Sequence, residues 1–291
     1  MLRPRACKTG ASRSCNTERL GPALVMALCV MMLRIARSVW VWGATALLAI
    51  PEFLVMLCIR AVDRDPMRRR TGNFMHACGA MITRFVPGWR VSHEGCDAAT
   101  LNGPFVIVAN HQSHTDIPVI CTLPFEVKWV AKKELFSVPV AGWMFSLSGE
   151  IAVDRKNSRA GAKALIQTVK YLDNGISVVF FPEGTRSSDG KLLRFQDGPF
   201  RIALKKGIPV LPVVVEGTGK LLPRNSLLFS DHNLFRVRLL PPVDTSAGQW
   251  KDAVSLRDEV RTRMQAALDA MGAKPPDLRP ARQSSEAVLS S

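Results

Sequence analysis

The chain has 291 residues, of which 47% are hydrophobic, and it carries a formal net charge of +15 at pH 7. This length suffices for one sizeable core with additional elements, and the charge favours an anionic partner: nucleic acid, a membrane surface or a phosphorylated ligand. A single Tyr, with no zinc-finger spacing and no aromatic-plus-basic motif, argues against nucleic acid. The seven Cys are an odd number without a C-x-x-C pair, which indicates free thiols in a reducing compartment.

The N-terminal part divides into a basic leader and an apolar region. Residues 1–20 are polar and basic, and we expect them to be disordered. Residues 21–87 are expected to form a membrane-associated helical region. A signal peptide fits poorly, because Arg34 and Arg37 stand where small residues should mark a cleavage site.

The apolar stretch 38–59 is long enough, at about 20 residues, to cross a bilayer. It also contains Pro51 and Glu52, and both a helix-breaking Pro and a carboxylate are costly at bilayer depth. An interfacial or re-entrant helix pair therefore competes with a full span. Flanking Trp and Arg residues suit a headgroup region and anionic lipid.

From residue 88 to residue 272, short apolar strands alternate with helical stretches, which predicts one α/β domain. The tail 273–291 is Pro- and Ser-rich and is expected to be disordered. Pro212 indicates an edge or a bulge in its strand. The helix at 158–173 should bury a stripe of Leu165, Val169 and Leu172. The predicted strands are 89–93, 105–109, 127–131, 151–153, 177–181, 210–215 and 235–239, and a second amphipathic helix is predicted at 253–271.

A His and an Asp lie five positions apart directly after the strand at 105–109. A carboxylate beside His111 can hold one tautomer of the ring and make it a better base, and Asp116 is within reach in sequence. A hydrogen-bonded capping pair is the simpler interpretation of such a motif. Metal binding by His111, His114 and Asp116 is a third, although zinc enzymes generally need a further ligand.

Other strand ends also carry charged groups. Glu183, Gly184 and Arg186 follow the strand at 177–181; Gly permits close approach of a ligand, and a guanidinium suits phosphate. Asp154 and Arg155 follow the strand at 151–153, and Lys132 follows the strand at 127–131. Each cation alone is more simply a solvated surface charge, but several at neighbouring strand ends favour an anion site.

These residues also carry a family resemblance. His111–Asp116 resembles the H-x-x-x-x-D block of glycerolipid acyltransferases, and Phe181–Ser187 matches their F-P-E-G-T-R-S block. Gly149–Arg155 resembles the block G-x-x-F-[IV]-x-R, with Ala152 where an aromatic is usual, and 208–213 resembles the fourth block. In detail the chain is most similar to the 1-acyl-sn-glycerol-3-phosphate acyltransferases.

The resemblance implies an α/β domain, with a mixed sheet flanked by helices, behind a membrane-associated helix pair. It implies acyl transfer from acyl-CoA or acyl-carrier protein to the sn-2 hydroxyl of 1-acyl-sn-glycerol 3-phosphate (lysophosphatidate), which forms phosphatidate without a cofactor or a metal. It also implies a place at the cytoplasmic or inner membrane, with the catalytic domain facing the cytosol.

In this interpretation His111 is the general base and Asp116 orients it; no G-x-S-x-G nucleophile elbow is present, so direct attack is expected. Backbone N–H groups near Gly184 are candidates for the oxyanion. The alternatives are another acceptor (glycerol-3-phosphate, a lysophospholipid or an aminolipid), a membrane-bound anion-binding protein and a metal-dependent hydrolase. Phosphate binding is assigned to Arg186 and Lys132 with Glu183, Gly184 and Thr185, supported by Asp154 and Arg155.

Overall fold

The computed structural model describes residues 20–154, 158–246 and 248–273. The expected disordered leader and tail lie outside these ranges, apart from the one residue of each that adjoins the folded chain. Arg155, to which a supporting role was assigned, also lies outside them.

The N-terminal region forms two helices, α1 (Leu20–Val62) and α2 (Arg69–Phe85). The apolar stretch 38–59 lies within one long helix, α1, which continues through Pro51 without a break; α2 is a second, shorter helix. A proline removes one main-chain hydrogen bond, and contacts on both sides can offset that loss. Such contacts exist, because Val41 and Met56 are buried against the rest of the protein.

Seven strands form one mixed sheet in the order β1-β7-β6-β2-β5-β3-β4. All neighbours are parallel except β6 and β7, which are antiparallel. The predicted α/β domain is confirmed, as is the mixed sheet that the resemblance implied, and β1 and β4 are its edge strands. The strands are β1 (Arg90–Gly95), β2 (Val106–Ala109), β3 (Val127–Lys132), β4 (Ile151–Val153), β5 (Ser177–Phe180), β6 (Val210–Glu216) and β7 (Leu234–Leu239).

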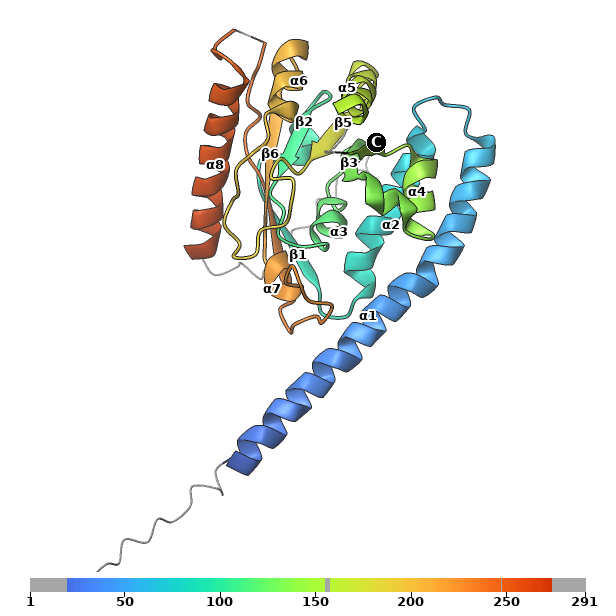
Figure 1. The fold of residues 1–291 in the computed structure, drawn as a ribbon, viewed down its shortest axis with the longest axis vertical. Helices are drawn as coiled ribbons and strands as arrows, with labels where there is room; N and C mark the ends of the chain where they lie inside the picture. The colour runs from blue at the N-terminus through green and yellow to red at the C-terminus, as the bar shows by residue number, and fades with distance from the viewer. Residues whose placement is uncertain (1–19, 155–157, 247, 274–291) are drawn as a thin grey trace, which may run out of the picture.

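Helices cover both faces of the sheet, so the strands alternate between two cores. Val106 and Val108 of β2 face one core, which contains residues of α5, α6 and α8; Ile107 and Ala109 face the other, which includes α3 and Val41 of α1. Figure 1 shows α5, α6 and α8 on one side and α1, α2 and α4 on the other. The remaining helices are α3 (Asp116–Ile120), α4 (Ala141–Ser148), α5 (Ser158–Asp173), α6 (Gly198–Lys206), α7 (Thr218–Leu221) and α8 (Ala253–Ala273), with short 3₁₀ turns η1 (Ala98–Thr100) and η2 (Lys133–Ser137).

Two details differ from the sequence prediction. Leu165 of α5 is 45% exposed, so the stripe predicted for that helix is wrong at this position; Ala164 and Thr168 are buried instead. Pro212 lies in β6, which is an interior strand, so the edge alternative is wrong. A bulge is present, but its extra residue lies in the segment 239–243 and not in β6, so the bulge alternative is wrong for the strand of Pro212, which pairs in register with Val108. Val213 pairs with Leu239 and Val210 with Val243, so three steps on β6 oppose four on the other segment.

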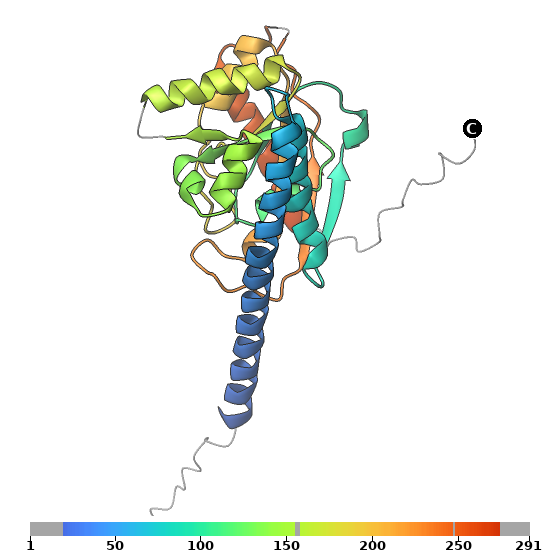
Figure 2. The ribbon, with the colours of Figure 1, turned by 90° about the vertical axis from the view of Figure 1, so that its right-hand side faces the viewer.

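The N-terminal half of α1 projects beyond the α/β domain, as both views show (Figures 1 and 2). Within the described part of the chain, the helix at Leu24–Val62 alone is long and apolar enough to cross a membrane. Residues 24–36 are all exposed, whereas Ser38 and Val41 already contact the domain. The contacts include hydrogen bonds from Trp42 Nε1 to the carbonyl oxygen of Leu227 and from the N–H of Phe229 to Ser38 Oγ.

Candidate active site

The His–Asp motif forms a hydrogen-bonded pair at the carboxyl end of β2. His111 Nδ1 lies 2.7 Å from Asp116 Oδ2. Asp116 begins α3, and the chain between the two residues turns back on itself, so that the carboxylate faces the ring. The His111 side chain is 16% exposed and that of Asp116 is fully buried. The ring therefore presents its far edge to solvent, while the carboxylate is shielded behind it.

Asp116 is saturated with donors. Its Oδ2 accepts hydrogen bonds from the N–H groups of Gln112 (2.7 Å) and Ser113 (2.9 Å) as well as contacting the His111 ring. Its Oδ1 accepts a hydrogen bond from the hydroxyl of Thr218, which begins α7. A carboxylate oxygen that faces a neutral imidazole can only accept, so His111 Nδ1 donates to it and the free lone pair of the ring is at Nε2.

The loop after β5 holds His111 from three sides. The ring stacks on Phe181, with centroids 4.0 Å apart and planes at 17°. Glu183 Oε1 accepts the N–H of His111 (2.9 Å), and the N–H of Ser187 donates to the carbonyl oxygen of His111 (2.8 Å). Glu183 Oε2 accepts the N–H of Leu193 (2.9 Å), so both carboxylate oxygens are used within the protein. Burial raises the pKa of Glu183, and these two backbone donors oppose that shift.

Gly184 and Arg186 form the outer part of the same loop. Gly184 has φ +73°, which favours glycine, and its N–H donates to the carbonyl oxygen of Phe181 (3.0 Å). This N–H is therefore unavailable to an oxyanion; those of Thr185 and Arg186 make no hydrogen bond within the described residues. The pKa of Arg186 is lowered by burial and by the nearby Arg224, against the opposing charge of Asp116. The guanidinium of Arg186 thus lies near Asp116, and that of Arg224 lies near Arg186.

The structure does not bring Lys132 or Asp154 to this pair. Lys132 is exposed and lies 3.5 Å from Glu134, and Asp154 lies 3.5 Å from Lys133. In β3, Trp129 faces the core that includes Phe181, whereas Val130 faces the opposite core. Because strand side chains alternate, Lys132 follows Val130 and points to the face opposite His111.

A cavity of about 400 Å³ opens beside His111. Gln112 and Ser187 form its wall on the side of the His–Asp pair. Its lining is of mixed charge: Lys191, Lys220 and Arg224 are cationic and Asp189, Glu216 and Asp269 are acidic, and Lys220 forms an ion pair with Glu216 (2.6 Å). No group of three or more His, Cys, Asp or Glu side chains is arranged to hold a metal ion in the part of the chain that the structure describes.

Two residues of the site carried no usable sequence signal. Thr218 is 102 positions from Asp116, and Arg224 lies in the connection after α7. Phe181 was predicted as the last residue of a strand and as the start of a family block, but not as a contact of His111; it follows β5 and stacks on the His111 ring. Asn110 was also missed as an anchor: its side chain forms two hydrogen bonds with the backbone of Val215 (2.9 and 2.7 Å), which extends the β2–β6 pairing to the edge of the site.

Comparisons with known proteins agree with this geometry. The sequence profile of a family described as Acyltransferase matches residues 90–216. A chloroplastic 1-acyl-sn-glycerol-3-phosphate acyltransferase of Arabidopsis thaliana is 34% identical over 206 residues, which cover 70% of this chain and 56% of that protein. Another, from Chlamydomonas reinhardtii, is 33% identical over 222 residues, which cover 75% of this chain and 67% of that protein. The matched region thus spans little more than half of the plant relative.

The crystal structure of the 1-acyl-sn-glycerophosphate acyltransferase PlsC from Thermotoga maritima superposes with a TM-score of 0.72 at 25% identity, covering 85% of this chain and all of that one. The match in fold, the coverage of the algal relative and the profile over the His–Asp region lead to one conclusion. The chain belongs to the 1-acyl-sn-glycerol-3-phosphate acyltransferase family.

Proposed function

We propose that the protein transfers a fatty acyl group from a thioester donor, acyl-CoA or acyl-carrier protein, to the sn-2 hydroxyl of 1-acyl-sn-glycerol 3-phosphate. The product is phosphatidate. The observation that carries this proposal is the pairing of a partly exposed His111 with the buried Asp116, whose oxygens accept several hydrogen bonds, beside the guanidinium of Arg186. The names of the relatives supply the acceptor and the product.

The proposed chemistry follows from the tautomer. Nδ1–H of His111 donates to Asp116, so Nε2 is free to accept the proton of the acceptor hydroxyl. The hydroxyl oxygen attacks the thioester carbonyl carbon; when the tetrahedral intermediate collapses, the C–S bond breaks and the imidazolium returns the proton to the thiolate. Asp116 stabilises the imidazolium between the two steps. The N–H groups of Thr185 and Arg186 are the nearest unused donors for the developing oxyanion.

Arg186 is assigned to the phosphate of the acceptor, with Arg224 as its partner. A phosphate dianion placed between two guanidinium groups would relieve their mutual repulsion and form charge-assisted hydrogen bonds. Glu183 is assigned to positioning of the loop, because both of its oxygens are occupied. Gly184 supplies the turn and Thr185 an N–H. Lys132, Asp154 and Arg155 have at most an accessory role in this arrangement.

We further propose that α1 anchors the protein in the membrane from which the lysolipid is taken, with the catalytic domain on the cytosolic side. The exposed stretch 24–36 measures about 20 Å along the helix axis, whereas the hydrocarbon core of a bilayer measures about 30 Å. This stretch alone is an anchor and not a full span. The exposed Leu227 and Leu228, beside Trp42, supply a second apolar contact on the same side of the domain.

The test is acyl transfer by the purified full-length chain with labelled acyl-CoA or acyl-carrier protein and a panel of acceptors. We expect lysophosphatidate to be preferred over glycerol-3-phosphate, lysophosphatidylcholine and an aminolipid. His111→Ala should abolish transfer while the protein remains folded and vesicle-bound. The matched control is His93→Ala; this residue lies on edge strand β1 and contacts Thr122, and its loss should leave transfer intact.

Retained transfer in His111→Ala would refute the mechanism. Preference for another acceptor would refute the proposed substrate but leave the mechanism standing. Binding of anionic lipid without any transfer would favour a membrane-bound anion-binding protein.

A further inference from the structure

The two oxygens of the Asp116 carboxylate have unequal shares of its hydrogen bonds. Oδ2 faces His111 Nδ1 and also accepts the N–H groups of Gln112 and Ser113. Oδ1 accepts the hydroxyl of Thr218 and, among the described residues, no other donor. Thr218 and Asp116 are both fully buried, so water does not reach this oxygen. The orientation of Oδ1 therefore depends on one hydroxyl group.

The hydroxyl of Thr218 controls the rotation of the carboxylate. The terminal torsion of an Asp side chain is broad, so neighbouring donors decide the orientation of its two oxygens. Without the hydroxyl, Oδ1 would be a buried acceptor with no partner, which is unfavourable. Rotation of the carboxylate would remove that defect by dividing the N–H groups of Gln112 and Ser113 between the two oxygens. The same rotation would move Oδ2 out of line with His111 Nδ1.

Thr218 has little freedom of its own, because α7 begins at this residue directly after a constrained turn. Gly217, between β6 and α7, has φ +99°, a conformation that favours glycine. A Cβ atom there would lie 2.3 Å from the carbonyl oxygen of Leu234, which begins β7. The backbone of β7 therefore holds the turn into α7 in place, and with it the Thr218 side chain.

Two further contacts attach α7 to the His–Asp turn. Ser113 Oγ donates to the carbonyl oxygen of Leu222, at the other end of α7 (2.9 Å). A Cβ atom on Gly219 would lie 3.2 Å from Gln112 Cβ, so the backbone of α7 packs directly on the turn. The helix is thus attached at its first residue, along its length and at its end. This attachment makes Thr218 a fixed donor to Asp116.

We propose that Thr218 is a positioning residue of the reaction: its hydroxyl fixes the rotation of the Asp116 carboxylate, which in turn fixes the ring of His111. The inference rests on the proposed acyl transfer and adds a third member to the His–Asp pair. The transferred proton moves between the acceptor hydroxyl and His111 Nε2, and the Thr218 proton stays on its own oxygen. Because Thr218 is buried behind Asp116, it touches neither substrate and should affect kcat and not KM.

The kinetic test is a graded series at this position, assayed with lysophosphatidate and the thioester donor that the wild type uses. Thr218→Val keeps the size of the side chain and replaces the hydroxyl by a methyl group. It should lower kcat by about 10–100-fold, in line with the strength of a hydrogen bond to a charged group, and leave both KM values within about twofold. Thr218→Ser keeps the hydroxyl and should retain kcat within about threefold of wild type. Thr218→Cys, whose thiol is a weak donor, should lie between the two.

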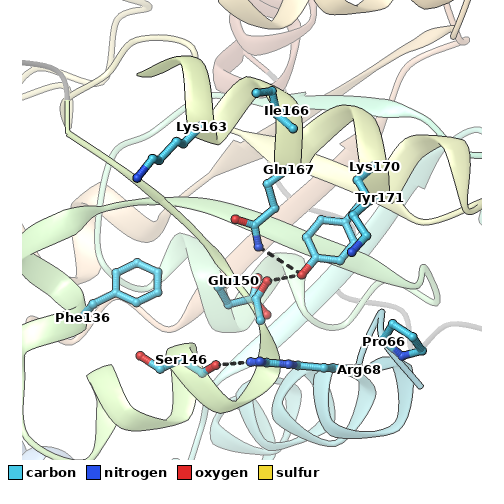
Figure 3. Close-up of a pocket in the computed structure, with 11 residues that line it drawn as sticks. Pro66, Arg68, Phe136, Ser146, Glu150, Lys163, Ile166, Gln167, Lys170 and Tyr171 are labelled. Atoms are coloured by element: carbon cyan, nitrogen blue, oxygen red, sulfur yellow. Dashed lines mark hydrogen bonds between the residues drawn. The ribbon is translucent and has the colours of Figure 1, made fainter. Parts of the chain in front are cut away.

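Thr71→Val is the matched control. Thr71 is fully buried, and its hydroxyl also donates to a buried carboxylate, Asp63 Oδ2, at 3.0 Å. It lies in α2 shortly after Arg68, which Figure 3 shows at the wall of a cavity of about 530 Å³. This cavity adjoins the amino end of β4, whereas His111 follows the carboxyl end of β2, and the strands from β2 to β4 are parallel. Thr71→Val should therefore lower the melting temperature, as Thr218→Val does, and leave kcat unchanged.

A spectroscopic test separates positioning from stability. In the full-length chain, labelled with ¹⁵N at histidine and held in detergent, the ring nitrogens of His111 report which one carries the proton, and His111→Gln identifies their signals. Wild type should show a protonated Nδ1 and a bare Nε2. Thr218→Val should give a mixture of tautomers or signals broadened by exchange, whereas Thr71→Val should give the wild-type signals.

The proposal is overturned by a kcat of Thr218→Val close to that of wild type, by equal losses in Thr218→Ser and Thr218→Val, or by an equal loss in Thr71→Val. If Thr218→Val does not fold, Thr218→Cys takes its place under the same criteria. Failure of the two proposals is distinguishable. Altered His111 signals in Thr218→Val, with no transfer even by wild type, refute the proposed function alone. Normal transfer and wild-type signals in Thr218→Val refute the role of Thr218 alone.

Discussion

Replacing Asp116 by Asn tests whether the charge of this residue, and not only its shape, serves the reaction. An Asn oxygen can take the place of Oδ2 and accept the N–H groups of Gln112 and Ser113 together with Nδ1–H of His111. The amide NH₂ would then face Thr218, whose hydroxyl can turn from donor to acceptor. Because every polar group keeps a partner, Asp116→Asn should fold and should preserve the tautomer of His111.

The expected loss is the attraction between the carboxylate and the imidazolium that forms during the reaction. For charges separated by 2.7 Å, Coulomb's law gives about 6 kcal/mol at an effective dielectric constant of about 20. The His111 side chain is 16% exposed, so water screens part of this energy. We take about 3–5 kcal/mol as the remaining contribution, which corresponds to a fall in kcat of about 10²–10⁴-fold.

The assay is acyl transfer to lysophosphatidate under saturating donor and acceptor, with thermal unfolding and vesicle sedimentation measured in parallel. A kcat within tenfold of wild type, in a variant with unchanged melting temperature, would refute the electrostatic role of Asp116. A second variant checks the predicted rearrangement. Thr218→Val added to Asp116→Asn removes the acceptor for the amide and should lower the melting temperature further.

Three further outcomes are expected. Glu183→Gln should lower the free energy of unfolding by about 1–3 kcal/mol and reduce kcat, because the amide NH₂ would face one of the two backbone N–H donors. Chemical denaturation measures the free energy of unfolding, and an unchanged value would contradict this prediction. Arg186→Ala should raise the KM for lysophosphatidate by about 10–100-fold and should change the KM for the donor little. Lys132→Ala should change the KM for lysophosphatidate by less than about threefold. Equal effects of the two variants would contradict the assignment of the phosphate to Arg186. Burial lowers the pKa of His76 to about 4, so between pH 6.5 and 4 the unfolded chain binds a proton that the folded protein does not. The free energy of unfolding should therefore fall by up to about 3 kcal/mol as the pH is lowered from 6.5 to 4. His76→Gln should flatten this slope in melting curves, and parallel curves would argue against it.

The elements that the sequence predicted best are those whose signal is local. β2 and β5 are short apolar runs buried on both faces, and both were located to within one residue at each end. His111 and Asp116 were paired correctly because only the four residues of one turn lie between them. Where an element depends on packing, prediction failed: Pro51 lies in an unbroken helix, and Leu165 is exposed although it has the right spacing.

The candidate site shows the same limit. Thr218 reaches Asp116 only because β6 lies beside β2 in the sheet, a neighbour relation that no local pattern encodes. Lys132 lies at the expected sheet edge, but the alternation of β3 turns it to the face opposite His111. Sequence reasoning located the strand ends, and the strand register decides which of their side chains converge.

The contacts of Phe181–Ser187 change the role that the sequence assigned to this block. Phe181 stacks on the His111 ring, Glu183 accepts the His111 N–H, and the N–H of Ser187 donates to the His111 carbonyl oxygen. These three groups hold His111 in place, and the polar groups among them already have hydrogen-bond partners within the protein. In the proposed function, phosphate binding by the block falls to Arg186, because its guanidinium forms no ion pair within the described residues and lies near the charge of Arg224. A block first interpreted as a phosphate loop thus has two separate tasks, and Glu183→Gln and Arg186→Ala should separate them as a kcat and a KM effect.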